Sequence, residues 1–247
     1  MIEIKSLSKQ FGSTEVLKAI SFSFDGKILG VCGSGKTTLL NIISGVIPCT
    51  EGEVLVSGDD ETSVSTVVKN DVGYLIENSP MPSEMTPVEF LNFVGASKGI
   101  SKQSLKKQID TVLDIIKLTE SKNVCIEHLN TFERKLLGVA QALLGNPGLV
   151  VLDDPFSDLT KAEKRTIRQL IKTIGELKTV IVSASTLSDF SDICDKIAYL
   201  SYGELLACEP IEILLPIVSA AEHDDEEEEY NEEEYNNEEN EEEEDAE

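Results

Sequence analysis

The first 25 residues alternate apolar and polar side chains with a period of two. Ile2 and Ile4 stand before an expected turn at 11–13, and Ile20 and Phe22 continue the alternation after it. Period-two alternation is typical of strands that cover a core with one face only. The pattern therefore predicts a small antiparallel β region at the N-terminus.

Beyond this region, short apolar runs alternate with segments of helical periodicity. Strands are predicted at 28–29, 54–56, 72–75, 149–152, 179–182 and 197–200. Helices are predicted at 37–44, 101–118, 132–144, 161–177 and about 187–194. Another helix is predicted to begin at 86, where Thr-Pro-Val-Glu offers an N-cap, an N1 proline and an N3 glutamate. Alternating strands and helices imply an α/β fold with a doubly wound parallel sheet, and residues 86–145 indicate a helical insertion in it.

The chain carries a net charge of −25, from 46 acidic and 21 basic residues, and this charge is concentrated at the C-terminus. Residues 222–247 contain 18 acidic residues and no Lys or Arg, so residues 1–221 balance 28 acids against 21 bases. A segment so charged and so poor in apolar residues cannot offset the entropy of ordering. This predicts one domain at 1–221 and a disordered acidic tail at 222–247. The alternative for the tail is an electrostatic contact with a basic partner surface.

The composition also argues against several classes of protein. The five cysteines include no C-x-x-C pair and only two histidines accompany them, which argues against a structural zinc site and favours a reducing cytoplasm. The best candidate for a membrane span, 211–221, is too short and contains Glu212 and Pro216. The N-terminus lacks the apolar region of a signal peptide. An acidic body without a basic stripe argues against a nucleic-acid partner.

Residues 30–37 read Gly-Val-Cys-Gly-Ser-Gly-Lys-Thr and match the phosphate-loop pattern G-x-x-x-x-G-K-[ST]. Glycines let backbone N–H groups approach phosphate oxygens, and the following helix adds the positive end of its dipole. Lys36 neutralises the β and γ phosphates, and the Thr37 hydroxyl can ligate Mg²⁺. We therefore predict an ATP and Mg²⁺ site. Its nucleotide-binding residues are predicted to be Gly30, Gly33, Ser34, Gly35, Lys36, Thr37 and Thr38.

Two carboxylates follow the most apolar of the predicted strands. The run at 149–152 ends in Asp153 and Asp154, at the carboxyl end of a strand, where α/β sheets place their ligands. We predict that Asp153 holds Mg²⁺ through water and that Asp154 faces the water that attacks the γ-phosphate. The alternative for this pair is an acidic turn between strand and loop.

With these two motifs in place, the chain resembles the ATP-binding subunit of an ABC transporter, most closely of exporters whose permease is a separate polypeptide. The stretches that carry the resemblance are 1–12, 36–45, 72–75, 137–147 and 193–198. It implies a P-loop NTPase fold, with a RecA-like parallel-sheet core, an N-terminal antiparallel β subdomain and an inserted α-helical subdomain. It also implies a dimer with a second ABC ATPase subunit, two sandwiched ATP molecules, a membrane permease as partner, and a cytoplasmic location on the inner face of the cell membrane.

The resemblance assigns roles to two further residues. Phe11 falls where the family stacks an aromatic ring on adenine, and a core Phe in a hairpin is the alternative. Glu77 takes the place of the Q-loop glutamine, which senses Mg²⁺ and relays to the permease. Because glutamate still offers oxygen to a metal or to water, Glu77 is both a metal and a catalytic candidate.

Four positions depart from the family's catalytic pattern. The signature loop, Leu-Ser-Gly-Gly-Gln in the family, reads Leu-Asn-Thr-Phe-Glu at 129–133. Asp154 replaces a glutamate, Thr160 replaces the aspartate of the D-loop, and Ser185 replaces the switch histidine. Hydrolysis is therefore expected to be slow, with Asp154, Ser185 and Glu77 as the catalytic candidates.

A fifth departure is one of length. About three residues of strand or loop are missing before Ser34, so either the strand is short or the loop is tight. Two functions stay open: a slowly hydrolysing ATPase subunit that drives an exporter, and a non-hydrolysing subunit that binds ATP and regulates a transporter or completes a heterodimer. An ABC protein acting on ribosomes or DNA is disfavoured by the single domain and the acidic surface.

Overall fold

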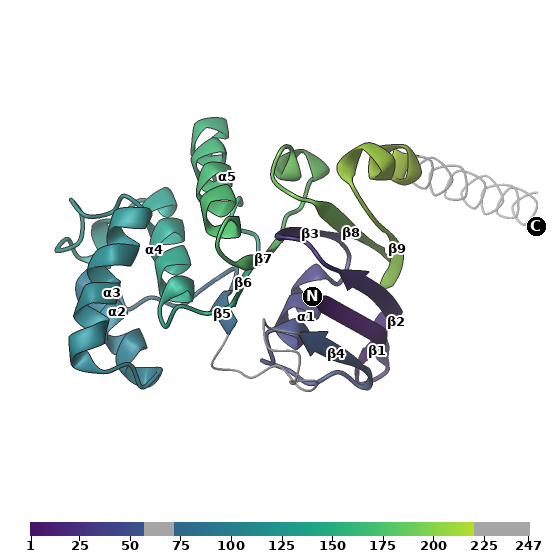
Figure 1. The fold of residues 1–247 in the computed structure, drawn as a ribbon, viewed down its shortest axis with the longest axis horizontal. Helices are drawn as coiled ribbons and strands as arrows, with labels where there is room; N and C mark the ends of the chain where they lie inside the picture. Colours follow the sequence, from purple (N-terminus) through teal and green to yellow (C-terminus); the bar gives the residue numbers. More distant parts are fainter. Residues whose placement is uncertain (57–71, 220–247) are drawn as a thin grey trace, which may run out of the picture.

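The computed structural model describes residues 1–56 and 72–219, which form two sheets and a helical arm (Figure 1). A three-stranded sheet has the strand order β2-β1-β4, and a six-stranded sheet has the order β5-β6-β7-β3-β8-β9. The predicted acidic tail at 222–247 lies outside the described residues. The α/β fold predicted from the sequence is confirmed.

The antiparallel sheet consists of β1 (Ile2–Phe11), β2 (Thr14–Phe24) and β4 (Glu51–Val56). Ile2 pairs with Phe24 on one side and with Val56 on the other. The apolar positions of the period-two pattern are buried against α1 (Lys36–Ile43) and one face of the larger sheet. The first 25 residues therefore form the β region that their alternation predicts.

The six-stranded sheet is parallel except at one edge, where β9 runs antiparallel to β8. Its strands are β3 (Ile28–Gly33), β5 (Val72–Leu75), β6 (Leu149–Leu152), β7 (Thr179–Ser183), β8 (Lys196–Ser201) and β9 (Glu204–Glu209). Leu152 pairs with Val182, and Val31 pairs with Ser183. The carboxyl ends of β6, β7 and β3 therefore meet at one edge of the sheet, where the predicted site residues follow.

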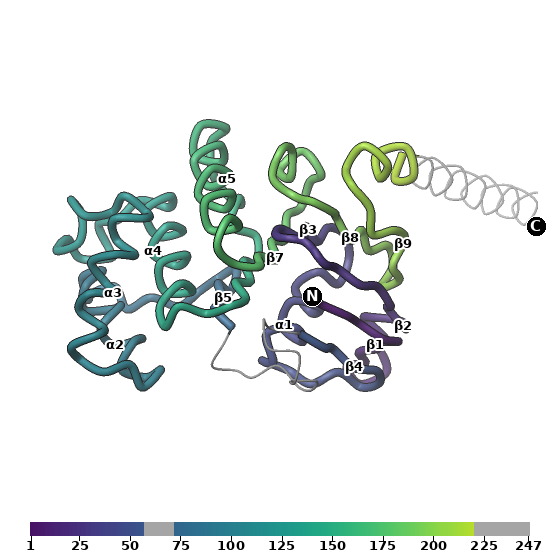
Figure 2. Tube along the Cα trace, in the orientation of Figure 1, coloured from purple at the N-terminus to yellow at the C-terminus, as the bar shows by residue number. Residues whose placement is uncertain are grey.

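The helical arm contains α2 (Pro87–Ser97), α3 (Lys102–Ile115) and α4 (Thr131–Leu143), and it lies at the opposite end of the molecule from the antiparallel sheet (Figure 2). The predicted start of α2 is confirmed, because the Thr86 hydroxyl accepts from the Glu89 N–H at 3.3 Å and the Glu89 carboxylate accepts from the Thr86 N–H at 2.9 Å. Leu105 of α3 and Leu137 of α4 are buried in the core of the arm.

One predicted helix is wrong. Residues 187–194 contain only the short 3₁₀ helix η2 (Leu187–Phe190). The buried Asp189 carboxylate accepts hydrogen bonds from Lys164 of α5 (Lys161–Gly175) at 2.9 Å and from the Thr186 hydroxyl at 3.0 Å. Side-chain anchoring rather than helical periodicity therefore fixes this segment. After β9, residues 211–219 form a last helix, and among the described residues no helix combines the length and apolarity needed to cross a bilayer.

Candidate functional site

The connection between β3 and α1 consists of only two residues, Ser34 and Gly35. The Ser34 N–H donates to the carbonyl oxygen of Leu200 at 3.1 Å, and the Gly203 N–H donates to Ser34 Oγ at 3.2 Å. Gly33 has a φ of +92°, and a Cβ there would lie 1.8 Å from the Leu200 oxygen, so this position requires glycine. β3 extends as far as Gly33. The residues that this chain lacks relative to the family pattern therefore shorten the loop and not the strand.

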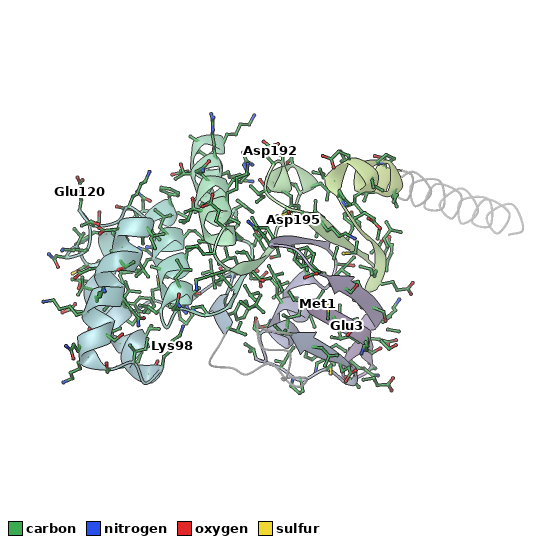
Figure 3. All side chains as sticks on the ribbon, viewed as in Figure 1. Met1, Glu3, Lys98, Glu120, Asp192 and Asp195 are labelled. Carbon is green, nitrogen blue, oxygen red and sulfur yellow. The ribbon has the colours of Figure 1, made fainter. Side chains whose placement is uncertain are left out.

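Gly30 lies within β3 and not in this loop. It pairs with Ile197 of β8, and a Cβ at Gly30 would lie 3.0 Å from the Ile197 side chain. Asp195, labelled in Figure 3, fixes where the strand begins, because its Oδ2 accepts from the N–H groups of Lys27 at 2.7 Å and Ile28 at 2.9 Å. Glycine at position 30 thus allows close packing inside the sheet, and the loop itself follows Gly33.

The N-terminus of α1 has no capping side chain among the described residues. Its N-cap residue is Gly35, and the first intrahelical bond runs from the Leu39 N–H to the Gly35 oxygen at 3.0 Å. The backbone N–H groups of Lys36, Thr37 and Thr38 therefore have no acceptor within the helix. These amides and the positive end of the helix dipole favour an anion, and the Lys36 ammonium adds a full charge. This end of α1 is suited to hold phosphate groups.

Asp153 is fully buried at the end of β6 and is contacted by three hydroxyl groups. Ser183 Oγ lies 2.6 Å and Thr37 Oγ1 3.3 Å from its Oδ1, and the Tyr74 hydroxyl lies 3.5 Å from its Oδ2. The Tyr74 hydroxyl also lies 3.2 Å from Asn41 Oδ1 of α1. Burial, followed by the charge of Asp153, raises the pKa of Tyr74 well above its usual range, so the hydroxyl stays a donor. Thr37 and Asp153, both predicted Mg²⁺ ligands, are thus in contact.

The donor atoms at this point suit Mg²⁺. A hydroxyl and a carboxylate are the hard oxygen ligands that Mg²⁺ binds together with water and substrate phosphates. Within the described residues, no three His, Cys, Asp or Glu side chains come together as a complete metal cage. The pair formed by Thr37 and Asp153 therefore fits an ion that shares its coordination shell with a nucleotide.

Asp154 and Ser185 meet at the turn that follows β6. Asp154 has a φ of +43°, and its Oδ2 accepts from Ser185 Oγ at 2.9 Å. Its N–H donates to Ser183 Oγ at 2.9 Å, and its carbonyl oxygen accepts from Lys135 Nζ at 3.0 Å. Lys135 also donates to Ser157 Oγ at 2.7 Å and so ties α4 to this turn. The hydrogen bond from Ser185 thus occupies one oxygen of the Asp154 carboxylate.

Two residues of this cluster escape the sequence analysis, Lys135 and Tyr74. Lys135 directly precedes the apolar run of α4, and a charged residue on the buried side of a helix is the signal that points to it. Tyr74 lies in the middle of β5 and reads as an ordinary strand residue. Only the pairing of β5 with β6 places its hydroxyl beside Asp153.

Two predicted residues make no hydrogen bond with this cluster in the described structure, although the charge of Glu77 contributes to the raised pKa of Tyr74. Glu77 is exposed two residues beyond β5 and makes no hydrogen bond or ion pair within the described part of the chain. Phe11, at the end of β1, is 50% exposed, and its ring centroid lies 4.9 Å from Lys9 Nζ. The alternative of a core Phe is therefore wrong, because half of the residue is exposed.

The N-terminus of α4 is closed by its own side chains. The Glu133 N–H donates to Asn130 Oδ1 at 2.9 Å, and the Asn130 N–H donates to Glu133 Oε2 at 3.0 Å. The Ser121 hydroxyl donates to the other oxygen of Glu133 at 2.8 Å. Phe132 packs against the core of the arm. The sequence at 130–133 therefore forms a capping box, with a carboxylate placed at the positive end of the helix dipole.

Comparison of the sequence with known proteins gives a consistent result. A family model described as ABC transporter matches residues 25–157. An uncharacterized ABC transporter ATP-binding protein of Methanocaldococcus jannaschii is 31% identical over 91% of this chain and 83% of that protein. The human phospholipid-transporting ATPase ABCA7 is 30% identical over 84% of this chain and 10% of its own length.

Solved structures agree in fold. A nucleotide-free ATP-binding cassette from an ABC transporter has a TM-score of 0.74 and 22% sequence identity, covering 89% of this chain and 95% of that one. A dimeric cassette in a post-hydrolysis state, bound to ADP and phosphate, has a TM-score of 0.72 and 22% identity, covering 85% and 99%. At this level of identity, the likeness describes the arrangement of strands and helices.

Proposed function

The chain belongs to the ABC transporter family. We propose that it is an ATP-binding subunit that holds ATP with Mg²⁺ at the carboxyl ends of β3 and β6. It couples ATP binding and slow hydrolysis to transport by a separate permease. The observation that carries the proposal is the contact between Thr37 at the start of α1 and the buried Asp153. It joins the phosphate-binding end of a helix to a carboxylate suited to a metal ion, and Lys36 directly precedes Thr37 in the chain.

Each residue has a definite task in this proposal. The N–H groups at the start of α1 and the Lys36 ammonium hold the phosphates. Thr37 and Asp153 hold Mg²⁺, which neutralises phosphate charge when bound. The exposed ring of Phe11 stacks on adenine, and Glu77 reaches the metal or its water from the segment after β5. Gly33, Ser34 and Gly35 shape the loop, which is closed by the contacts of Ser34 with the β8–β9 turn.

Hydrolysis in this proposal is slow. Asp154 is one methylene shorter than the family's glutamate, and Ser185 Oγ already donates to its carboxylate. A reacting group displaced by about 1 Å costs on the order of 100-fold in rate. Loss of one electrostatic stabiliser costs roughly 10²–10³-fold, and such losses do not multiply freely because the groups act as a unit. Either loss alone makes turnover slow.

The proposed partners follow from the family. The chain works beside a second ABC ATPase subunit and below a separate membrane permease, on the cytoplasmic face of the membrane. The helical arm that contains α2 and α3 makes the permease contact. It exposes apolar side chains, with Phe93 60% and Ile115 41% accessible.

Parallel measurements of nucleotide binding and phosphate release test the proposal. Fluorescent mant-ATP should bind at micromolar concentration in the presence of Mg²⁺, and phosphate release should be slow but above that of Lys36→Ala, the matched control for contaminating ATPases. Binding without turnover above this control would assign the chain to the non-hydrolysing alternative. If the unmodified chain unfolds cooperatively, and is therefore folded, but binds no nucleotide, the proposal is overturned.

A further inference from the structure

Helix α5 carries five basic residues on one face. Lys161, Lys164, Arg165, Arg168 and Lys172 follow one another at intervals of three or four residues, apart from the adjacent pair Lys164 and Arg165. At 100° per residue these five positions fall within an arc of about 100°. They form a stripe that runs along most of the helix, and we call it the α5 stripe.

Most of the α5 stripe has no acidic partner in the described structure. Lys164 forms an ion pair with the buried Asp189. Within residues 1–56 and 72–219, no ion pair involves the other four, of which three are exposed and Arg168 is half-buried. Glu163 of α5 is engaged in a capping box with Thr160, on a different face of the helix.

Such a stripe is unexpected in so acidic a chain. The charge pattern of the sequence predicts an acidic body without a basic stripe, and the structure corrects this, because five of the 21 Lys and Arg residues gather on one helix. The other helix with several exposed lysines is α3, where Lys102, Lys106 and Lys107 are followed by Asp110 and Asp114. The α5 stripe is thus the longer run of cations without intervening acids, and it calls for an anionic partner.

We propose that the partner of the α5 stripe is the acidic segment 222–247 of the same chain. That segment contains 18 acidic residues and no Lys or Arg, so it complements the stripe in charge. It begins three residues after the helix at 211–219, which is packed on the domain through the buried Leu214 and Val218. In Figure 1 this last helix and α5 rise from the same side of the six-stranded sheet, with the η2 segment between them.

The length of the segment allows this contact. A chain of 28 residues, from 220 to 247, extends at most about 100 Å. A domain of this size has a radius of gyration of about 17 Å, and α5 is about 22 Å long. The segment therefore reaches every part of the stripe. A tether of this length also holds it at an effective concentration near the millimolar range, which makes a weak electrostatic contact persist.

The location of the stripe gives the contact a consequence. α5 starts directly after the turn that contains Ser157 and Thr160, and this turn is joined to Asp154 through Lys135. A docked acidic segment neutralises the stripe beside this turn and excludes other polyanions, such as anionic lipid surfaces. The contact involves none of the proposed nucleotide-binding residues, so its failure leaves the proposed function untouched.

A synthetic peptide of residues 222–247 tests the inference. We expect it to bind a chain truncated after Ala221 and to bind the full chain at least about tenfold more weakly, because the full chain already fills its own stripe. Raising the salt from about 50 to about 300 mM should weaken binding by a further factor of about ten, since the contact is electrostatic. Equal binding to the full and truncated chains would overturn the proposal.

Charge-reversal variants of the truncated chain locate the binding surface. The triple variant Arg165→Glu, Arg168→Glu, Lys172→Glu should lose peptide binding. The matched triple variant Lys102→Glu, Lys106→Glu, Lys107→Glu on α3 should keep it. Should the first triple variant fail to fold, the milder pair Arg165→Gln, Lys172→Gln should still weaken binding several-fold. Equal losses from α5 and α3 would show that the segment merely follows overall charge and would overturn the inference.

The remaining occupants are distinguished by two further measurements that compare the full chain with the chain truncated after Ala221. Sedimentation should give the same oligomeric state for both chains. A self-association abolished by the truncation would place the segment on a second copy instead. Phosphatidylglycerol vesicles should bind the truncated chain better than the full chain. Equal binding of both chains to these vesicles would mean that the stripe is open to lipid, and the intramolecular contact would be refuted.

Discussion

The N-termini of α1 and α4 present the same backbone problem and solve it in opposite ways. Each helix begins with N–H groups that have no acceptor in the helix. At α4 the side chains of Asn130 and Glu133 meet this need from within, and a third contact from Ser121 holds the carboxylate in place. At α1 the N-cap is Gly35, and the residue that follows is the cation Lys36. The first end is closed, and the second is left for an anion.

This difference gives physical meaning to the departures from the family pattern. Two of the side chains that depart from the signature loop, Asn130 and Glu133, cap α4, so a carboxylate of the chain itself stands at this helix end. The shortened loop before α1 keeps its glycines at positive φ and its free amides. Of the two ends, only α1 retains the chemistry that recognises phosphate.

The largest expected effect comes from Gly33→Ala, which tests whether the α1 end depends on the tight loop. Its φ of +92° and the 1.8 Å approach of a Cβ to the Leu200 oxygen should lower the free energy of unfolding by about 4 kcal/mol or more, measured in urea. Gly12→Ala is the matched control, because its φ is +60° and a Cβ there meets nothing within 4 Å. The control should cost about 1 kcal/mol. Equal costs would mean that the loop has room to spare.

The next effect is on nucleotide affinity, through Lys36→Ala. Loss of a charged donor to phosphate should cost about 2 kcal/mol, a roughly 30-fold rise in the Kd for mant-ATP. Lys27→Ala is the control, since Lys27 precedes β3 and its contact with Asp195 is made by the backbone N–H. A change below about threefold for Lys36→Ala would mean that phosphate binds elsewhere than at the open end of α1.

The contrast between the two helices can also be tested at α4, by removing the carboxylate that caps its N-terminus. Glu133→Ala removes the carboxylate that accepts from Asn130 and Ser121, and it should lower the free energy of unfolding by about 1 kcal/mol. Thr131→Ala, at an exposed position in the same turn, should change stability by less. Sulfate should raise the Tm of Glu133→Ala more than that of the unmodified chain, because α4 would then resemble α1. Identical sulfate shifts would contradict the view that Glu133 closes this end.

Features with a strong local signal were predictable from sequence. The apolar positions of α3 repeat at helical spacing, and the helix expected at 101–118 is found at Lys102–Ile115. The start of α2 was readable because an N-cap, a proline and a glutamate fall within four residues. The same holds for the position of Asp153 directly after an apolar strand and for the glycine turn around Ser34 between strand and helix. In each case a few neighbouring residues determine the backbone, so no distant contact is needed.

Features that depend on distant contacts were not predictable. Lys135 meets Asp154 across 19 residues, and only the folded arm brings α4 to the turn after β6. The segment at 187–194 was expected to be helical, but the buried ion pair between Asp189 and Lys164 fixes it as a short 3₁₀ turn. The helical spacing of the α5 stripe is visible in the sequence. It does not appear in the net charge, because that sum is dominated by the acidic residues elsewhere in the chain.

The smallest expected effect is that of Tyr74→Phe, and it tests how closely the α1 end is connected to Asp153, the carboxylate proposed to bind Mg²⁺. The Tyr74 hydroxyl lies 3.2 Å from Asn41 Oδ1 of α1 and 3.5 Å from Asp153 Oδ2, so its single proton is shared between two long contacts that link helix and strand. Its loss should raise the Mg²⁺ concentration for half-maximal ATP binding about threefold, as expected for a weak hydrogen bond. Tyr202→Phe, at a side chain that is 71% exposed, is the matched control. Nucleotide affinity in EDTA should not change, because a positioning residue for Asp153 acts through the metal. A parallel loss of affinity with and without Mg²⁺ would instead mean that Tyr74 only packs the wall of the site.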